Sequence, residues 1–262
     1  MKPIEVFRNG RERAEYLLRL HELLCNTRRR GTREDWARNF KRMMHWRQRE
    51  QIHRVDGRQS VVVLREGAAI TPEQFQEGAL NELVRAALVG VVSALDRYCH
   101  DLVVSRIVRT LGRSEKRINK ELRQLQIPIM AARMAVWHAR IRRGKGGRIR
   151  TRPMTIIRHA IQDMLYRESY QGPEEINRAL RMVEIEDLWR GCATAMDCTA
   201  KDVVERLKQV VDRRNKIVHE GDVLRRRRGG KLALHPVSRR QVLQDVQWVG
   251  SLVDAIETIA NQ

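Results

Sequence analysis

One long apolar segment constrains the fold of this chain more than any other feature. A Thr-Pro-Glu sequence beginning at Thr71 indicates a helix start, because proline at the first helical position loses no hydrogen bond. From there to about Leu111 the hydrophobic residues recur at helical spacing, and residues 83–95 are apolar almost all round. A helix that is apolar on every side must be covered by other elements. We therefore predict an all-α fold with this segment as the central helix of a bundle.

A second predicted helix, residues 199–219, carries a charged residue within its apolar face. Thr199 and Asp202 form a capping-type start, and Gly221 supplies a stop, since glycine readily adopts the left-handed conformation of a helix C-cap. The apolar stripe consists of Val203, Val204, Leu207, Val210, Val211, Ile217 and Val218. Arg214 lies in the middle of this stripe, where its permanent charge is costly unless a carboxylate, a phosphate or a cavity compensates it.

Two polar residues follow Arg214 on the same helix. Asn215 and His219 form an i, i+4 pair and therefore lie above one another on the flank beside the stripe. On a straight helix, His219 is about 140° round from Arg214, which is too far for both to hold one small ligand. We expect the helix to end here, so that a change of direction at Gly221 brings the imidazole toward the guanidinium.

Residues 214–219 read Arg-Asn-Lys-Ile-Val-His and resemble the Arg-polar-x3-His motif of the HEPN superfamily of helical ribonucleases. Asp222 also suits the RiboL-PSP branch of that superfamily, and residues 85–103 look like its long helix. The resemblance is close in these two segments and loose over residues 71–255. It implies a HEPN-like helical bundle at residues 67–262, which leaves residues 1–66 as an N-terminal helical extension.

The resemblance implies an endoribonuclease, and the residue types suit one that needs neither a metal nor a cofactor. The 2′-hydroxyl of the RNA attacks the adjacent phosphorus, while His219 moves protons and Arg214 stabilises the negative charge that develops. Asn215 fixes the imidazole tautomer or contacts the phosphate. Asp96 either forms a local ion pair with His100 or is the buried partner that orients Arg214 toward a phosphate.

A single turnover needs both a base and an acid, whereas the motif supplies one histidine per chain. HEPN proteins are similar in forming composite sites between helices, so we expect a homodimer built on residues 199–219. Some toxin members carry a tyrosine two residues after the histidine, where this chain has Gly221. The resemblance therefore leaves open a toxin with a different kind of antitoxin protein, or an antiphage defence effector.

Strong positive charge favours a polyanionic partner. The chain has 52 Lys and Arg against 32 Asp and Glu, a net charge of +20. Such an excess favours nucleic acid or an anionic membrane as the partner, through long-range electrostatics and counterion release. Two basic loops are candidate RNA-binding segments, although each also has the interpretation of a solvated linker. Their cations are Arg142, Arg143, Lys145, Arg148, Arg150 and Arg152 in the first, and Arg225, Arg226, Arg227 and Arg228 in the second.

Membrane and secreted proteins are not favoured as classes. The longest uncharged apolar run, residues 86–95, is far shorter than the ~20 residues of a spanning helix. The first seven residues have no apolar signal core. We therefore expect a cytoplasmic protein that does not contact a membrane.

Three smaller features complete the prediction. An aromatic and methionine stripe precedes residue 47 and is either core or a surface for stacking bases; it contains Trp36, Phe40, Met43, Met44 and Trp46. Residues 60–64 are a β-branched run that is either a strand or a buried connector. Four cysteines lack zinc-ligand spacing and are predicted to be buried free thiols; they are Cys25, Cys99, Cys192 and Cys198.

Two other functions stay open at this point. In the first, the chain is a non-catalytic RNA- or DNA-binding module of the same fold, in which Arg214 only pairs with Asp96 and His219 only caps its helix. In the second, it is an interaction subunit whose basic surface docks an acidic antitoxin. Cleavage of RNA in excess chelator distinguishes the enzyme from both.

Overall fold

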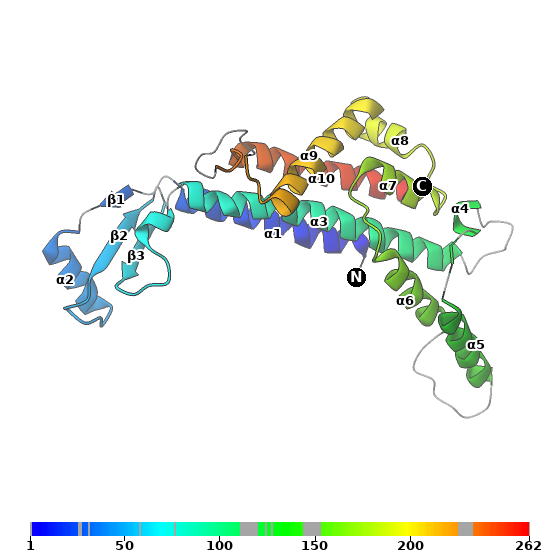
Figure 1. Ribbon diagram of the computed structural model, residues 1–262, viewed down its shortest axis with the longest axis horizontal. Coiled ribbons are helices and arrows are strands. Elements are labelled where there is room, and N and C mark those ends of the chain that lie inside the picture. Colours follow the sequence, from blue (N-terminus) through cyan, green and yellow to red (C-terminus); the bar gives the residue numbers. More distant parts are fainter. Residues whose placement is uncertain are drawn as a thin grey trace.

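The computed structural model describes residues 2–25, 28–30, 32–57, 59–75, 77–110, 120–123, 125–126, 128–143, 153–224 and 233–261. These residues form a helical bundle with one small antiparallel sheet (Figure 1). The first elements are α1 (Pro3–Leu24), β1 (Arg28–Arg30), α2 (Glu34–Met43), β2 (Ile52–Asp56), β3 (Val61–Arg65) and the 3-10 helix η1 (Pro72–Phe75). They are followed by α3 (Glu77–Thr110), α4 (Lys120–Arg123), α5 (Ile129–Arg143), α6 (Pro153–Leu165), α7 (Pro173–Arg181), α8 (Leu188–Ala195), α9 (Ala200–Glu220) and α10 (Arg239–Ala260).

The central helix of the bundle is α3. Its residues Val84, Leu88, Val91 and Leu95 have no exposed surface, as expected for a helix that is apolar all round. It is surrounded by α1, α6, α7, α9 and α10, which all pack against it. The all-α prediction is confirmed, and so is a central helix in this segment. Its predicted start at residue 71 was wrong, because Pro72–Phe75 forms the 3-10 helix η1 and α3 begins at Glu77.

The composition of α3 also meets the requirements of a membrane span. Among the described residues, one helix, Gly78–Thr110, is long and apolar enough to cross a membrane by length and composition alone. The core helix of a bundle has a similar composition, because other helices cover much of its surface. The packing of α1, α9 and α10 on α3 makes this composition weak evidence for a span.

The N-terminal helix α1 belongs to the bundle and runs antiparallel to α3. Near its start, the Phe7 ring meets the Tyr98 ring edge-on at 6.1 Å between centroids. Near its end, His21 Nε2 lies 3.2 Å from Asn81 Oδ1. The predicted boundary between an N-terminal extension and the bundle, at residue 66, therefore does not match the structure. The helix α1 is part of the core, and the part of the chain outside the bundle begins at β1.

Residues 28–66, which we call the sheet unit, lie beyond one end of the bundle (Figure 1). The strands pair antiparallel in the order β1-β2-β3. The prediction of a helical extension was therefore wrong for residues 28–66, which form a small sheet with one helix, α2. Of the two interpretations of residues 60–64, the strand is correct, because β3 pairs with β2 from Val61 to Arg65. The Ser60 hydroxyl donates to the Leu23 carbonyl at 3.0 Å and joins the unit to the end of α1.

The three aromatic residues of the stripe pack against one another in the sheet unit. Trp36 and Phe40 stack at 5.0 Å between ring centroids, and Phe40 meets Trp46 edge-on at 5.6 Å. All three rings are half-buried. Met43 and Met44 are exposed instead, because they lie at the C-terminal end of α2. The stripe is thus neither a closed core nor a fully open stacking surface.

The cysteines are all free, and three of the four are buried as predicted. Burial raises the pKa of Cys192 to about 12 and that of Cys99 further, so both are neutral thiols at physiological pH. The prediction was wrong for Cys198, which is exposed. Cys198 lies in the turn between α8 and α9, where the chain crosses the surface.

The close approach of α1 and α3 is testable at Gly10. A Cβ at this position would lie 2.6 Å from the Ala94 Cβ, and such overpacking typically costs about 1–3 kcal/mol. We expect Gly10→Ala to lower the free energy of unfolding in the wild type. In the Ala94→Gly background the same change should raise it, because alanine favours a helix over glycine by about 1 kcal/mol.

Chemical denaturation of the four proteins measures the coupling between the two positions. A coupling energy above about 0.5 kcal/mol is expected for residues in contact. Additive effects of the two substitutions would show that the helices are not this close.

Candidate active site

The helix α9 has nearly the boundaries that its sequence predicts. The Thr199 hydroxyl accepts from the Asp202 backbone N–H at 3.1 Å, and the Asp202 carboxylate accepts from the Thr199 backbone N–H at 3.2 Å. The last helical residue is Glu220, followed by Gly221 in the left-handed conformation at φ 60°. Glycine adopts this conformation without strain, so the chain turns sharply after α9.

Arg214 keeps its charge without an acidic partner. The buried face of α9 packs on α3, α7 and α8, and Arg214 is half-buried. Its Nη1 donates to Asn215 Oδ1 at 2.9 Å, whereas its Nε is buried and has no acceptor within the described part of the chain. The misfit that the sequence indicated is therefore present in the structure: a cation borders an apolar face and lacks a carboxylate.

The neighbouring Arg213 is in the opposite situation, because it shares a buried carboxylate with Arg85. Asp222 Oδ2 accepts from Arg85 Nε at 2.7 Å and from Arg213 Nη2 at 2.8 Å, and Arg213 Nη1 also donates to Asp222 Oδ1. The exposed fractions of the Asp222 and Arg85 side chains are 1% and 6%. Arg85 also donates to the His235 carbonyl at 2.9 Å. We call Arg85, Arg213 and Asp222 the arginine clamp.

The arginine clamp fixes the end of α9 to the start of α3. Burial acts to raise the pKa of Asp222, but hydrogen bonds from Arg213 and Arg85 outweigh it, so the pKa lies below its usual value. Asp222 is therefore ionised at neutral pH, and its charge compensates two arginines. The backbone of Asp222 is left-handed, with φ 57°, which aims the side chain back toward α3 after the turn at Gly221.

Sequence reasoning missed Arg85 and Arg213, and it included Asp222 only through the family resemblance. A usable signal was present for Arg85, since it is a charged residue inside the otherwise apolar segment 83–95. That is the same kind of misfit that identified Arg214. No comparable signal distinguished Arg213 from an ordinary solvated arginine.

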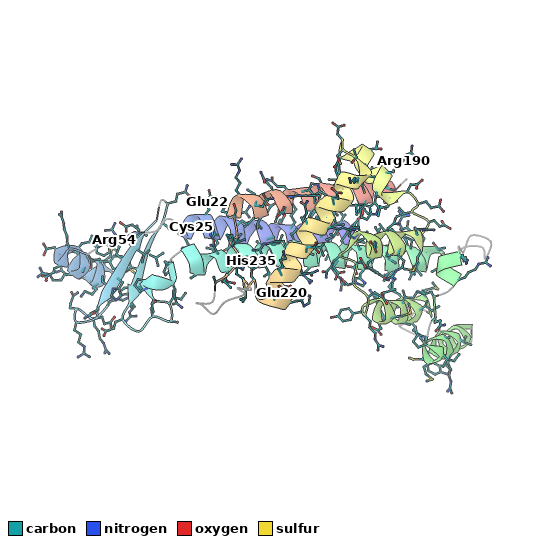
Figure 2. All side chains as sticks on the ribbon, turned by 45° about the horizontal axis from the view of Figure 1, so that its top comes forward. Glu22, Cys25, Arg54, Arg190, Glu220 and His235 are labelled. Carbon is teal, nitrogen blue, oxygen red and sulfur yellow. The ribbon has the colours of Figure 1, made fainter. Side chains whose placement is uncertain are left out.

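A short antiparallel connection lies beside the clamp. Val223 bridges to Leu234, and the His235 N–H donates to the Asp222 carbonyl at 2.8 Å. Figure 2 shows Glu220 and His235 next to one another at this end of α9. The segment that enters α10 is thereby held against the last turn of the motif helix.

His219 lies in the last turn of α9 and is exposed. Because α9 stays helical through Glu220, the turn comes after the imidazole rather than before it. The expected change of direction therefore does not bring His219 toward Arg214, and the separation of about 140° around the helix persists. Within one chain, the two side chains face different directions.

Asp96 does not pair with Arg214, which corrects the second of its two predicted roles. Its carboxylate accepts from the Tyr170 N–H at 2.6 Å and from Gln171 Nε2 at 3.3 Å, and His100 Nε2 lies 3.7 Å away. The reason is position along α3: Asp96 is roughly 16 Å beyond Arg85, where α9 docks. It orders the segment before α7 instead.

The two predicted RNA-binding loops lie largely outside the described residues. Arg142 and Arg143 end α5, but only their backbone is described. Lys145, Arg148, Arg150 and Arg152 of the first loop and Arg225, Arg226, Arg227 and Arg228 of the second are not described. Their role in binding stays a prediction.

A groove of about 590 Å³ borders the arginine clamp, between α9 and the start of α10. Arg213 and the exposed Arg240 line it, together with Ser238, which caps α10 by accepting from the Gln241 N–H. The groove is thus polar and has two arginines on its walls, together with Asp245, which is paired with Arg206. It offers an anionic chain a path past the end of α9.

Comparison with protein-family models, with curated proteins and with solved structures finds no match. Among the described residues, no group of three or more His, Cys, Asp or Glu side chains is placed to hold a metal ion. The interpretation of the site therefore rests on its own geometry.

The arginine clamp predicts a large loss of stability in Asp222→Asn. Removing one partner of a buried ion pair typically costs about 3–5 kcal/mol, because it leaves buried charge uncompensated. We expect a loss of this size at pH 7 by chemical denaturation. The matched control is Asp254→Asn, which removes an exposed carboxylate paired with Arg8 at 3.6 Å and should change stability by less than about 1 kcal/mol.

The stability difference between wild type and Asp222→Asn should depend on pH in one direction. An Asp whose pKa is lowered by folding contributes stability that is fully present above its unfolded pKa of about 4 and is lost as pH falls through the folded pKa. The gap between the two proteins should therefore stay constant from pH 7 to 5 and shrink below about pH 4. A gap that widens on acidification would contradict the clamp.

Proposed function

We propose that this protein is a metal-independent endoribonuclease of HEPN type, with Arg214, Asn215 and His219 as its active-site residues. The observation that carries the proposal is the contrast between two adjacent arginines. Arg213 is compensated by a buried carboxylate, whereas Arg214 has, among the described residues, only the amide oxygen of Asn215. A cation held against an apolar face without a carboxylate favours an anion from outside the chain, such as an RNA phosphate.

The residue types fit cleavage by the 2′-hydroxyl of the RNA itself. His219 is exposed at the end of α9 and is free to exchange protons with a bound substrate. The planar guanidinium of Arg214 matches two phosphate oxygens and stabilises the charge that develops on them. Asn215 accepts from Arg214 and so orients the guanidinium, which is a third role besides the two predicted from sequence.

A second copy of the chain completes this site. Arg214 and His219 face different directions on one helix, so two antiparallel or crossing copies of α9 bring the arginine of one chain to the histidine of the other. Two histidines also supply both a base and an acid for one turnover. Val218 lies beside His219 with 46% of its surface exposed, which suits a contact between copies.

The proposed cellular role is that of a toxin or an antiphage defence effector, which follows from the HEPN resemblance. The main alternative is a non-catalytic RNA- or DNA-binding module, and an interaction subunit that docks an acidic antitoxin is the second. In the module as the sequence predicts it, Arg214 pairs with Asp96. Its hydrogen bonds within the described residues favour the enzyme over this alternative, since none goes to Asp96.

Cleavage of RNA in excess chelator tests the proposal. We expect the wild type to cut a labelled RNA, with His219→Ala slower by about 10²–10⁴ because proton transfer is lost. Arg214→Ala should be slower by about 10²–10³ because charge stabilisation is lost. Lys216→Ala, an exposed cation on the same helix, is the matched control and should keep the rate.

Binding of the same RNA, measured by fluorescence anisotropy, separates the outcomes. If His219→Ala and Arg214→Ala cleave slowly but still bind the RNA, both residues have catalytic roles. If wild type binds RNA and never cuts it, the protein is a binding module. If His219→Ala cuts normally, the chemistry is not that of this motif.

A mixed dimer tests whether the site is shared between two chains. We co-express Arg214→Ala and His219→Ala with different tags and purify the species that carries both. This dimer keeps one Arg214 and one His219 on different chains, so a shared site predicts cleavage well above that of either parent. An active monomer by ultracentrifugation, together with a mixed dimer no more active than its parents, would rule out the shared site.

A further inference from the structure

The sheet unit carries far more positive charge than its size requires. Residues 28–66 contain twelve Lys and Arg against five Asp and Glu, so these 39 residues hold +7 of the +20 on the chain. Positive charge at this density opposes folding through self-repulsion unless a polyanion or a function offsets it. Some of these cations stabilise the unit itself, and others have no partner in it.

Three of the five acidic residues of the sheet unit form an ion pair with a nearby arginine. Arg54 Nε pairs with Asp56 at 2.5 Å, and Arg65 Nη2 pairs with Glu50 at 2.8 Å. On α2, Arg38 pairs with Asp35 at 2.6 Å. These contacts leave the unit with a surplus of cations.

The surplus points to solvent. Four arginines are exposed, and their side chains make no hydrogen bond or ion pair with the described residues: Arg33, Arg42, Arg47 and Arg49. Lys41 differs, because it is buried and donates to the Gln48 and Glu50 carbonyls at 2.5 and 3.2 Å. The structure therefore uses one cation to order the turn after α2 and leaves four for a partner.

Aromatic rings and guanidinium groups pack against one another in the same unit. Arg54 lies 4.9 Å over the Trp36 ring, Trp36 stacks on Phe40, and Phe40 meets Trp46, over which Arg65 lies at 4.9 Å. The rings are half-buried, so part of each faces outward. Aromatic and guanidinium planes are surfaces on which unpaired bases stack, and free cations beside them bind the backbone.

The sheet unit and the candidate active site lie at the same end of the bundle. β2 packs on η1, which leads directly into α3, and the clamp residue Arg85 is about 12 Å along α3 from its first residue. Figure 2 shows Arg54 on the sheet and Glu220 at the end of α9, with the start of α3 between them. One nucleic-acid strand can therefore follow both.

We propose that the sheet unit is a binding surface for single-stranded RNA, which holds the substrate while the end of α9 cuts it. The proposal rests on the proposed function for the identity of the strand as substrate. The binding surface itself stands on the unpaired arginines and on the stacked rings. It is distinct from both basic loops.

The test compares two triple variants with equal loss of charge. The first is Arg42→Gln/Arg47→Gln/Arg49→Gln in the sheet unit. The matched control removes three exposed arginines of the bundle that have no partner among the described residues, Arg13→Gln/Arg158→Gln/Arg190→Gln. Both are built in His219→Ala and titrated in chelator with a labelled 20-nucleotide RNA, so binding is measured without cleavage.

Each phosphate contact to a single strand contributes about 0.7 to the slope of log K against log salt. Loss of three contacts should lower this slope by about 2 in the sheet-unit triple. The control triple should change it little. Equal effects of the two triples would mean that only total charge matters, which overturns the proposal. Competition by poly-aspartate as strong as by RNA of equal charge also overturns it, since the surface would then fit an acidic protein.

A second measurement covers the case in which the sheet-unit triple fails to fold. RNA carrying 4-thiouridine is cross-linked to the otherwise unmodified His219→Ala protein, and the attached peptides are identified by mass spectrometry. Cross-links within residues 28–66 support the proposal, and cross-links only elsewhere overturn it. Failure of wild type to cut RNA contradicts the proposed function alone, because neither binding measurement depends on cleavage.

Discussion

The buried carboxylate of Asp222 is the interaction on which the candidate active site depends. An arginine placed near the core is tolerated only if its charge is compensated. Arg85 meets this condition through a residue 137 positions later in the chain. Because the same carboxylate also binds Arg213, one buried anion determines where α9 ends relative to α3. The position of His219 follows from that attachment.

The clamp also explains why adjacent arginines on α9 have different roles. Both are half-buried, but they point about 100° apart around the helix, so a single carboxylate reaches only one of them. Arg213 is thereby a structural residue, and Arg214 keeps an unused binding capacity. A second acid near Arg214 would have removed this capacity. The site is thus defined by the residues present and by the lack of a carboxylate at Arg214 within the described part of the chain.

The parts of this structure that are local in sequence could be predicted, and those that depend on distant contacts could not. The ends of α9 follow from Thr199 and Gly221, whose side-chain and backbone chemistry acts within one turn, and the core position of α3 follows from its composition. A pairing between Arg214 and Asp96 would be a long-range contact, and the sequence does not show where along α3 the end of α9 docks. In the structure, the end of α9 docks beside Arg85 and not beside Asp96. Only β3 was among the strands considered, as one of two interpretations of residues 60–64. β1 and β2 were missed because they are only 3 and 5 residues long, so their alternation is too short to recognise.

The placement of the sheet unit between α1 and α3 makes it an insertion into a helical hairpin. His21 and Asn81 already bring the two helices together at the point where the unit departs and returns. A short loop could therefore close this hairpin without moving either helix, since the ends it must join are neighbours. Such an arrangement allows the inserted part to change in sequence or size over evolution while the bundle, and the chemistry at the end of α9, keep their own stability.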